Sequence, residues 1–233
     1  MNLSVFRKPI LVVPGFIFIA CMSGCSLMPV SSNVSTSKYL AGLPSRNQQA
    51  VIVEPIVRSH ARVTAWESKD GHWQEVFSPM RAMVGRSGIA PLNEKREGDG
   101  RTPSGTYALV LAFGYAPSIG TKLSYRQTTQ NDFWVDDVNS SQYNQWVTGK
   151  PDASSFEEMK RKDDLYQYGV VIEYNTNPIV PGNGSAIFMH IWRAPGKPTS
   201  GCVAFSSRSL RNLLAWLDVK RDPVILLISD QEK

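Results

Sequence analysis

The chain has 233 residues, of which 42% are hydrophobic and 19% are charged, with 25 Lys and Arg against 20 Asp and Glu. This hydrophobic content excludes a disordered chain, and the length suits one well-packed core better than two. Basic residues are interspersed with acidic ones instead of gathering into patches, which argues against a nucleic-acid-binding protein. The three Cys and three His do not form the close pairs of a structural zinc site.

The first 24 residues have the pattern of an export signal. Arg7 and Lys8 are followed by an apolar run from Ile10 to Cys21, which is long enough for a secretory signal and short for a membrane span of about 20 residues. The run ends in Met22-Ser-Gly-Cys25, which resembles a bacterial lipobox. This resemblance implies a lipoprotein signal peptide over 1–24 and lipidation of Cys25. The alternatives are an ordinary signal peptide and an uncleaved anchor.

The residue after the expected lipidation site bears on the location. Ser26 stands where an Asp would retain a Gram-negative lipoprotein at the inner membrane, so the resemblance favours the outer membrane. We therefore expect a protein of the bacterial cell envelope that is lipid-anchored and faces the periplasm. After cleavage and lipidation, Cys202 would be the only free thiol, either inert and buried or reactive.

The mature chain divides into a tether and one folded domain. Residues 25–50 are rich in Ser, Asn, Thr and Gln and predict a flexible tether, and residues 51–233 predict a mainly β domain with a few helices. Segments 62–66 and 73–77 flank Ser68-Lys-Asp-Gly71 and predict a hairpin. Further strands are expected at 80–84, 107–113, 169–174, 186–192, 203–205 and 224–228.

Two helices are expected. Ser155-Phe-Glu-Glu158 fits a capping box and predicts a polar helix reaching about Leu165. Ser207 can cap the second helix, in which Leu210, Leu213, Leu214 and Leu217 have the spacing of one buried helical face.

One stretch carries the residues for acyl transfer. His190 lies on an apolar strand, and eleven residues later Ser200-Gly-Cys202 leads into another short apolar strand. A His beside a Cys can take the thiol proton, so that the thiolate attacks an amide carbonyl and forms a thioester. Backbone N–H groups of Gly201 and Cys202 are the expected oxyanion donors, and a backbone carbonyl could fix the His190 tautomer. On these residues alone, a packing role for both side chains remains an alternative.

This stretch resembles the signature of the L,D-transpeptidase (YkuD-type) family, in which a His on a strand is followed by a loop and then Ser-(His or another small residue)-Gly-Cys. A second block, Gly98-Asp-Gly-Arg-Thr-Pro-Ser-Gly-Thr-Tyr107, is similar to the Asp-x-x-Thr-Pro-x-Gly-x-(Phe/Tyr) segment of the same family. The two blocks occur in the family's order, and the resemblance covers roughly residues 51–230.

The resemblance implies a β-sandwich catalytic domain with Cys202 as nucleophile and His190 as general base and acid. The implied partner is the tetrapeptide stem of peptidoglycan, attacked at the carbonyl of its third residue with expulsion of D-alanine. Such activity would serve cell-wall crosslinking or remodelling and cell shape. No metal or organic cofactor is implied.

The chain departs from the family's common form at two positions. Ile191 replaces the Gly after the His, and Ala204 replaces an Arg thought to position substrate carboxylates. Arg193, Lys197, Arg86 and Arg101 are candidates for that role, with Arg193 and Ser200 as expected substrate-binding residues. The segment 127–168, called here the insert, is long and carries Trp134, Tyr143, Trp146 and Tyr166. It could cover the groove as a lid, or its aromatic residues could serve packing.

Three functions therefore remain open on the sequence. The first is a peptidoglycan L,D-transpeptidase. The second is an L,D-carboxypeptidase or hydrolase that uses the same Cys–His site, and the third is a non-catalytic, lipid-anchored wall-binding module. Retention of both His190 and Cys202 argues against the third, because either residue alone would suffice for packing.

Overall fold

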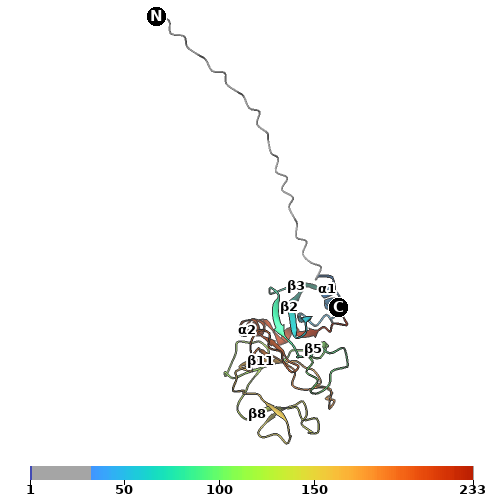
Figure 1. Ribbon diagram of the computed structural model, residues 1–233, viewed down its shortest axis with the longest axis vertical. Coiled ribbons are helices and arrows are strands. Elements are labelled where there is room, and N and C mark those ends of the chain that lie inside the picture. Colours follow the sequence, from blue (N-terminus) through green and yellow to red (C-terminus); the bar gives the residue numbers. More distant parts are fainter. Residues whose placement is uncertain (2–32, 233) are drawn as a thin grey trace. The chain divides into compact units, whose positions relative to one another are not determined.

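The computed structural model describes Met1 and residues 33–232, so the expected signal peptide, Cys25 and the start of the expected tether lie outside the described residues. Within the described part, fourteen strands and few helices confirm the expected mainly β fold (Figure 1). The helices are α1 (Asn33–Ala41), α2 (Ser207–Trp216) and the short 3-10 helix η1 (Val219–Arg221). The strands are β1 (Gln49–Val57), β2 (His60–Lys69), β3 (His72–Glu75), β4 (Met80–Met83), β5 (Gly105–Ala108), β6 (Leu111–Gly114), β7 (Ser124–Gln127), β8 (Asp132–Val135), β9 (Trp146–Thr148), β10 (Phe156–Glu158), β11 (Tyr168–Val171), β12 (Phe188–Ile191), β13 (Val203–Phe205) and β14 (Val224–Leu227).

Eleven of the described strands form one sheet in the order β5-β14-β1-β2-β4-β13-β12-β11-β6-β7, with β3 paired to β2. Most neighbours are antiparallel, but β1 and β14, β12 and β13, and β6 and β7 run parallel. Val53 of β1 and Ala112 of β6 are far apart in this order and still belong to one buried cluster. The sheet therefore curls around a single main core, with β12 and β13 in its interior.

Helix α2 closes this core as the leucine spacing predicts. Leu210, Leu213, Leu214 and Leu217 are each 0–1% exposed and pack in the main cluster. The cap is Ser206, one residue before the expected Ser207, and its side-chain oxygen accepts a hydrogen bond from the Ser209 N–H at 3.1 Å. The helix thus covers the sheet from which the expected site projects.

The predicted strands are largely confirmed, but one of them is divided into two. The hairpin is β2 and β3, and the segments expected after residue 160 coincide with β11, β12, β13 and β14. The expected strand 107–113 is two strands, because β5 pairs with β14 whereas β6 pairs with β11. The buried Leu109 lies at the change of partner, and its N–H donates to the Pro223 carbonyl at 2.9 Å.

The expectation of a flexible tether is wrong for residues 33–50. Residues 33–41 form α1, which lies beside the β2–β3 hairpin (Figure 1). Leu40 is 3% exposed and packs against strands β1 and β14, and the Tyr39 hydroxyl donates to the Glu232 carbonyl at 2.7 Å. The polar composition of this segment gave no sign of the contacts of Leu40 and Tyr39. These two side chains attach α1 to the C-terminal part of the domain.

The predicted helix at 155–165 is also wrong. The segment forms β10, which pairs antiparallel with β8 so that Glu157 lies opposite Trp134. Ser155 does not cap a helix, since its side chain bonds to Asp136 on the neighbouring chain segment. A helix here would have no continuous apolar face to bury, because only Met159 is fully buried between residues 155 and 164. Pairing with β8 is therefore the better solution.

The insert is an integral layer of the domain. Its strands form a three-stranded sheet in the order β10-β8-β9. Trp134, Tyr143 and Tyr166 are 2–5% exposed, and Trp134 packs edge-to-face on Phe188 of β12 with ring centroids 5.0 Å apart. The packing interpretation of its aromatic residues is confirmed, and Trp134 and Tyr166 share a second buried cluster with Phe188 and Cys202.

Candidate active site

The sheet brings His190 and Cys202 together although eleven residues separate them. β12 and β13 are parallel and in register at Met189 with Val203 and at His190 with Ala204. Cys202 precedes β13 by one residue and therefore lies level with Phe188 at the start of β12, two residues before His190. Both side chains line one cavity of about 290 Å³. The two residues that the sequence predicts as a pair are thus a spatial pair.

The His190 ring is buried and its orientation is fixed. Its Nδ1 lies 2.7 Å from the Ile191 carbonyl oxygen, and because a carbonyl only accepts hydrogen bonds, Nδ1 carries the proton. Burial lowers the pKa of His190 to about 4, since the charged ring would lose its hydration. The neutral ring at pH 7 therefore leaves Nε2 as a free base. The expected carbonyl partner is present, at the residue that replaces the family's Gly.

The Cys202 thiol is held in its protonated form. The side chain is 7% exposed, and Sγ donates a hydrogen bond to the Ala186 carbonyl at 3.3 Å. Burial, and then the negative charge of Glu157, raise the pKa of Cys202 to about 12. Ala186 has a φ of 52°, a left-handed conformation that few non-glycine residues adopt. The residue whose carbonyl accepts from Cys202 Sγ is thus the one with this unusual backbone.

Cys202 lies at the junction of two cavities. The first, of about 290 Å³, also contains His190, and its basic side chains are Arg86, Arg161, Arg193 and Lys197. The second, of about 250 Å³, carries three carboxylates, those of Glu97, Asp136 and Glu157, together with Arg86 and Lys95. Four residues line both cavities: Arg86, Glu157, Ser200 and Cys202. A substrate that reaches Cys202 from both sides would therefore meet cations on one side and mainly carboxylates on the other.

The second sequence block supports the backbone of the nucleophile. The Thr102 side chain is fully buried, and its hydroxyl accepts from the Gly85 N–H at 3.0 Å and donates to the Cys202 carbonyl at 3.5 Å. Asp99 of the same block accepts from the Arg101 N–H at 2.8 Å and pairs with Lys95 at 2.9 Å. The two sequence blocks thus meet in one site.

The turn before the nucleophile is stabilised by Thr199. Its hydroxyl donates to the Cys202 carbonyl at 2.7 Å and accepts from the Gly201 N–H at 3.2 Å. Use of the Gly201 N–H as an oxyanion donor would require exchange of this bond. A Cβ at Gly201 would lie 3.1 Å from the Arg101 carbonyl oxygen and 3.0 Å from Ile187, so close packing is a second reason for glycine here.

The candidate cations differ in their partners. Arg193 lines the His190 cavity and is bound to Asp163 at 2.9 Å. Arg86 donates to Ser200 at 3.4 Å and to the Gly98 carbonyl at 3.3 Å, with no carboxylate partner among the described residues. Arg101 lines neither cavity. Ala204 lies beside His190 on β13, and among the four candidate cations Arg86 alone lines both cavities at Cys202.

The sequence did not indicate that the carboxylates of Glu97, Asp136 and Glu157 line the site. Tyr166 was expected as an aromatic residue of the insert, but not as a hydrogen-bond donor in the site. Glu157 and Tyr166 lie in the insert and reach the site only because β10 pairs with β8. No local pattern marks them, and the expectation of a helix at 155–165 placed Glu157 in a different setting. Among residues 33–232, no group of three His, Cys, Asp or Glu could hold a metal ion, and neither helix is long and apolar enough to span a bilayer.

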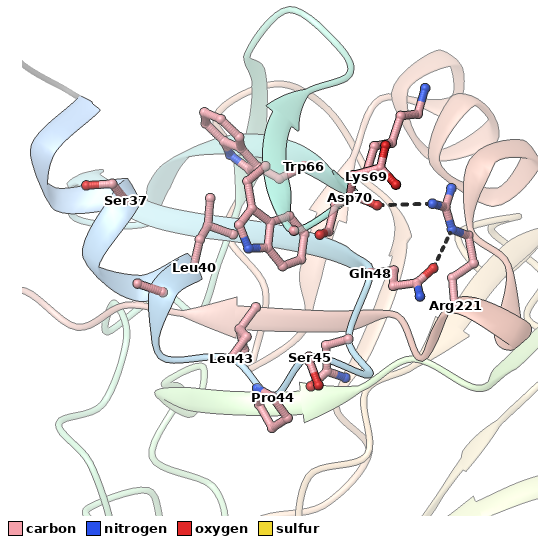
Figure 2. Close-up of a pocket in the computed structure, with 15 residues that line it drawn as sticks. Ser37, Leu40, Leu43, Pro44, Ser45, Gln48, Trp66, Lys69, Asp70 and Arg221 are labelled. Atoms are coloured by element: carbon pink, nitrogen blue, oxygen red, sulfur yellow. Dashed lines mark hydrogen bonds between the residues drawn. The ribbon is translucent and has the colours of Figure 1, made fainter.

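A larger cavity lies elsewhere. It measures about 1120 Å³ and is bounded by α1, the β2–β3 hairpin and Arg221. Figure 2 shows Leu40 and Trp66 on one side of it and Gln48 bonded to Arg221 on the other. None of its lining residues belongs to the two cavities at Cys202. Size alone therefore does not identify the candidate active site.

Comparison with known families agrees with the site. The L,D-transpeptidase catalytic domain (YkuD) family matches residues 56–226, which is most of the chain. The chain belongs to the L,D-transpeptidase family. The match contains both sequence blocks, His190 and Cys202, and it accounts for the curled β domain.

Solved structures give a more distant likeness. Two crystal structures of the helical cell shape determining protein Pgp2 from Campylobacter jejuni, one of them a point mutant, are similar to this chain at 16% and 15% identity. They cover 78% and 82% of this chain, with TM-scores of 0.41 and 0.39. This chain spans about half of their length, 47% and 54%. No curated protein matches the chain.

Proposed function

We propose that this L,D-transpeptidase family member is an active, cysteine-dependent transpeptidase that acts on tetrapeptide stems of peptidoglycan. The observation that carries the proposal is the single cavity shared by a neutral His190, whose Nδ1 is occupied by the Ile191 carbonyl, and the Cys202 thiol. A scaffold that had lost catalysis would have no need to keep this tautomer beside a buried thiol.

The first step is acylation of Cys202. Sγ attacks the carbonyl carbon of the stem's third residue, and the thiol proton passes to Nε2 of His190. The tetrahedral intermediate collapses by expelling D-alanine, whose amine takes the proton from Nε2, and a thioester remains. Because burial opposes both the free thiolate and the imidazolium, proton transfer must accompany the attack instead of preceding it.

The second step is transfer to an amine. The acceptor amine of a neighbouring stem gives its proton to Nε2 of His190, attacks the thioester and releases Cys202 as a thiol. Water is the competing nucleophile, and amine transfer prevails when the acceptor is held in position and water is excluded. Glu157, Leu165 and Tyr166 of the insert form a wall of the His190 cavity and supply this cover.

The test is incubation of the purified mature protein with tetrapeptide muropeptides, with and without a millimolar D-amino acid, followed by mass spectrometry. Exchanged and crosslinked species are expected, with little free tripeptide. Cys202→Ser should abolish turnover, and His190→Ala should lower it by about 10²-fold or more. Formation of tripeptide alone in both reactions would instead establish the hydrolase, and an inactive wild-type protein would support the wall-binding module.

The location is part of the proposal. A lipid anchor at Cys25, with Ser26 next to it, would hold the domain at the periplasmic face of the outer membrane, where the peptide stems of the wall lie. The support is the sequence pattern of residues 1–26, since these positions other than Met1 lie outside the described residues.

A further inference from the structure

Among the described residues, Glu157 is the only carboxylate that lines both cavities at Cys202. It lies on β10, is half-buried, and is fixed in register opposite Trp134 of β8. Its neighbour Glu158 is exposed and lines neither of these cavities. A negative charge is thus built into the wall beside the nucleophile, and its strand neighbour offers a matched control.

Tyr166 connects this carboxylate to both members of the Cys–His pair. Its hydroxyl donates a hydrogen bond to Glu157 Oε2. Its ring lies edge-to-face against the His190 ring, with centroids 5.3 Å apart, and is 4% exposed. Tyr166 and Cys202 belong to the same buried cluster and the same cavity. A single side chain therefore contacts the base and reaches both the nucleophile and a buried acid.

Acidic and basic side chains both surround Glu157. Glu97 and Asp136 line the second cavity with Glu157, and Asp136 Oδ1 is buried without a hydrogen-bond partner. Burial, and then repulsion from these two carboxylates, raise the pKa of Glu157. The cations that face it are Arg161, whose guanidinium lies 5.1 Å from the Tyr166 ring centroid, Arg86, and Lys95, which is paired with Asp99. Burial and the two neighbouring carboxylates thus disfavour the ionised form of Glu157, which shares both cavities with the Cys202 thiol.

The Tyr166 hydroxyl has one hydrogen and therefore serves one acceptor at a time. In this structure the hydroxyl donates its hydrogen bond to Glu157. A hydrogen bond from the same hydroxyl to Cys202 would lower the pKa of the thiol, whereas the charge of Glu157 raises it. The two residues thus act on the sulfur in opposite directions.

We propose that Glu157 and Tyr166 are positioning residues that set the reactivity of Cys202 in opposite senses. The Glu157 carboxylate binds the Tyr166 hydrogen and opposes the thiolate. When the thiolate forms, the Tyr166 hydroxyl turns its hydrogen to the sulfur, and neutralisation of Glu157 by a proton or a cationic group of the substrate favours that turn. The inference deepens the proposed function, because it regulates the same nucleophile.

The test measures alkylation of Cys202 by iodoacetamide as a function of pH, with the modified peptide quantified by mass spectrometry so that other cysteines do not contribute. In Glu157→Gln, which keeps an acceptor and removes the charge, the midpoint of the profile should fall and the rate near pH 8 should rise about tenfold. In Tyr166→Phe, which keeps the ring and removes the hydroxyl, the midpoint should rise and the rate should fall.

Glu158→Gln is the control and should leave the profile unchanged. Circular dichroism and thermal unfolding would show that each variant is folded. Simple loosening of the site would accelerate alkylation in both variants, so shifts of the same sign would overturn the proposal, as would an unchanged midpoint in Glu157→Gln. Because alkylation needs no wall substrate, opposite shifts without muropeptide turnover would refute the proposed function and leave this inference standing.

Discussion

Thr102 and Cys202 lie 100 residues apart in the chain, and the Thr102 hydroxyl donates to the Cys202 carbonyl while it accepts from the Gly85 N–H. All of these groups are buried. The contact explains why the Thr-Pro block and the Ser-Gly-Cys block occur together in one sequence. One block supplies Cys202, the proposed nucleophile, and the other holds its backbone.

Thr102→Val should therefore destabilise the domain. The substitution keeps the shape of the side chain but leaves the buried Gly85 N–H without its partner, which costs about 1–3 kcal/mol. Urea unfolding of the two proteins at pH 7 measures the difference. Thr106→Val, at an exposed position of β5, is the control and should change the free energy of unfolding by less than about 0.5 kcal/mol. Equal effects at the two sites would contradict the role assigned to Thr102.

His190 predicts a pH dependence of stability. Its pKa is about 4 in the folded chain and near 6.5 when unfolded, so the unfolded chain binds the proton first as the pH falls. The contribution of the neutral ring is complete above pH 6.5 and is lost towards pH 4, by about 3 kcal/mol. Glu157 and Asp136, whose pKa values are raised, act in the opposite direction.

The measurement is therefore a comparison of unfolding between pH 7 and pH 4 for the wild type and His190→Gln. The wild type should lose more stability than the variant over this window. Parallel curves would show that His190 does not titrate with a depressed pKa.

Arg86 predicts an effect on substrate binding. It lines both cavities and carries no ion-pair partner within the described part of the chain, and we propose that it takes the role of the Arg absent at Ala204. Arg86→Gln should raise KM for muropeptides about tenfold, because a charge-assisted hydrogen bond to a carboxylate is lost. Arg193→Gln, which removes a cation already bound to Asp163, should change KM less. A larger effect at Arg193 would reverse this assignment.

Gly169 predicts a packing effect next to the base. It lies opposite both His190 and Phe113 in the sheet, and a Cβ there would lie 2.1 Å from the Phe113 ring. Gly169→Ala should cost about 1–3 kcal/mol and lower the thermal midpoint, since the buried ring has no free space. Gly42→Ala, where the nearest atom would be 3.6 Å from the new carbon, is the control. An unaffected midpoint in Gly169→Ala would contradict the packing described.

The anchor predicts a fractionation result. The wild-type protein should sediment with membranes, and Cys25→Ala should move it to the soluble periplasmic fraction, because lipidation of that thiol is the expected attachment. Detection by immunoblot with Cys202→Ala as a second variant separates the two thiols. A wild-type protein that is wholly soluble would refute the anchor.

The sequence predicted correctly those elements whose own residues determine their structure. The leucine spacing of α2, the Asp-Gly hairpin turn and the apolar strands are each set by their own residues. His190 and Cys202 could be paired because one strand ends and another begins at them. The parallel pairing of β12 and β13 was not predicted and comes from the structure.

The wrong predictions, the helix at 155–165 and the flexible tether at 33–50, have one physical cause. In each case, packing against a segment distant in the sequence determines the structure. β10 is a strand because β8 offers an edge, although Ser155 to Glu158 reads as a helix cap. Residues 33–41 fold because Leu40 finds a cleft between the hairpin and β14. The role of Glu157 and Tyr166 could not be predicted for the same reason, since only the packed insert brings them to the nucleophile.

The pairing of β12 with β13 bears on how such chains are recognised. Because the register His190 with Ala204 and the bonds of Thr199 place both side chains, we expect that the loop from Trp192 to Pro198 can lengthen or shorten without moving either one. A search pattern that demands a fixed interval between the His and the Cys would therefore overlook functional relatives. A pattern that demands a buried strand ending in His, and a Gly-Cys step into a second buried strand, would retain them.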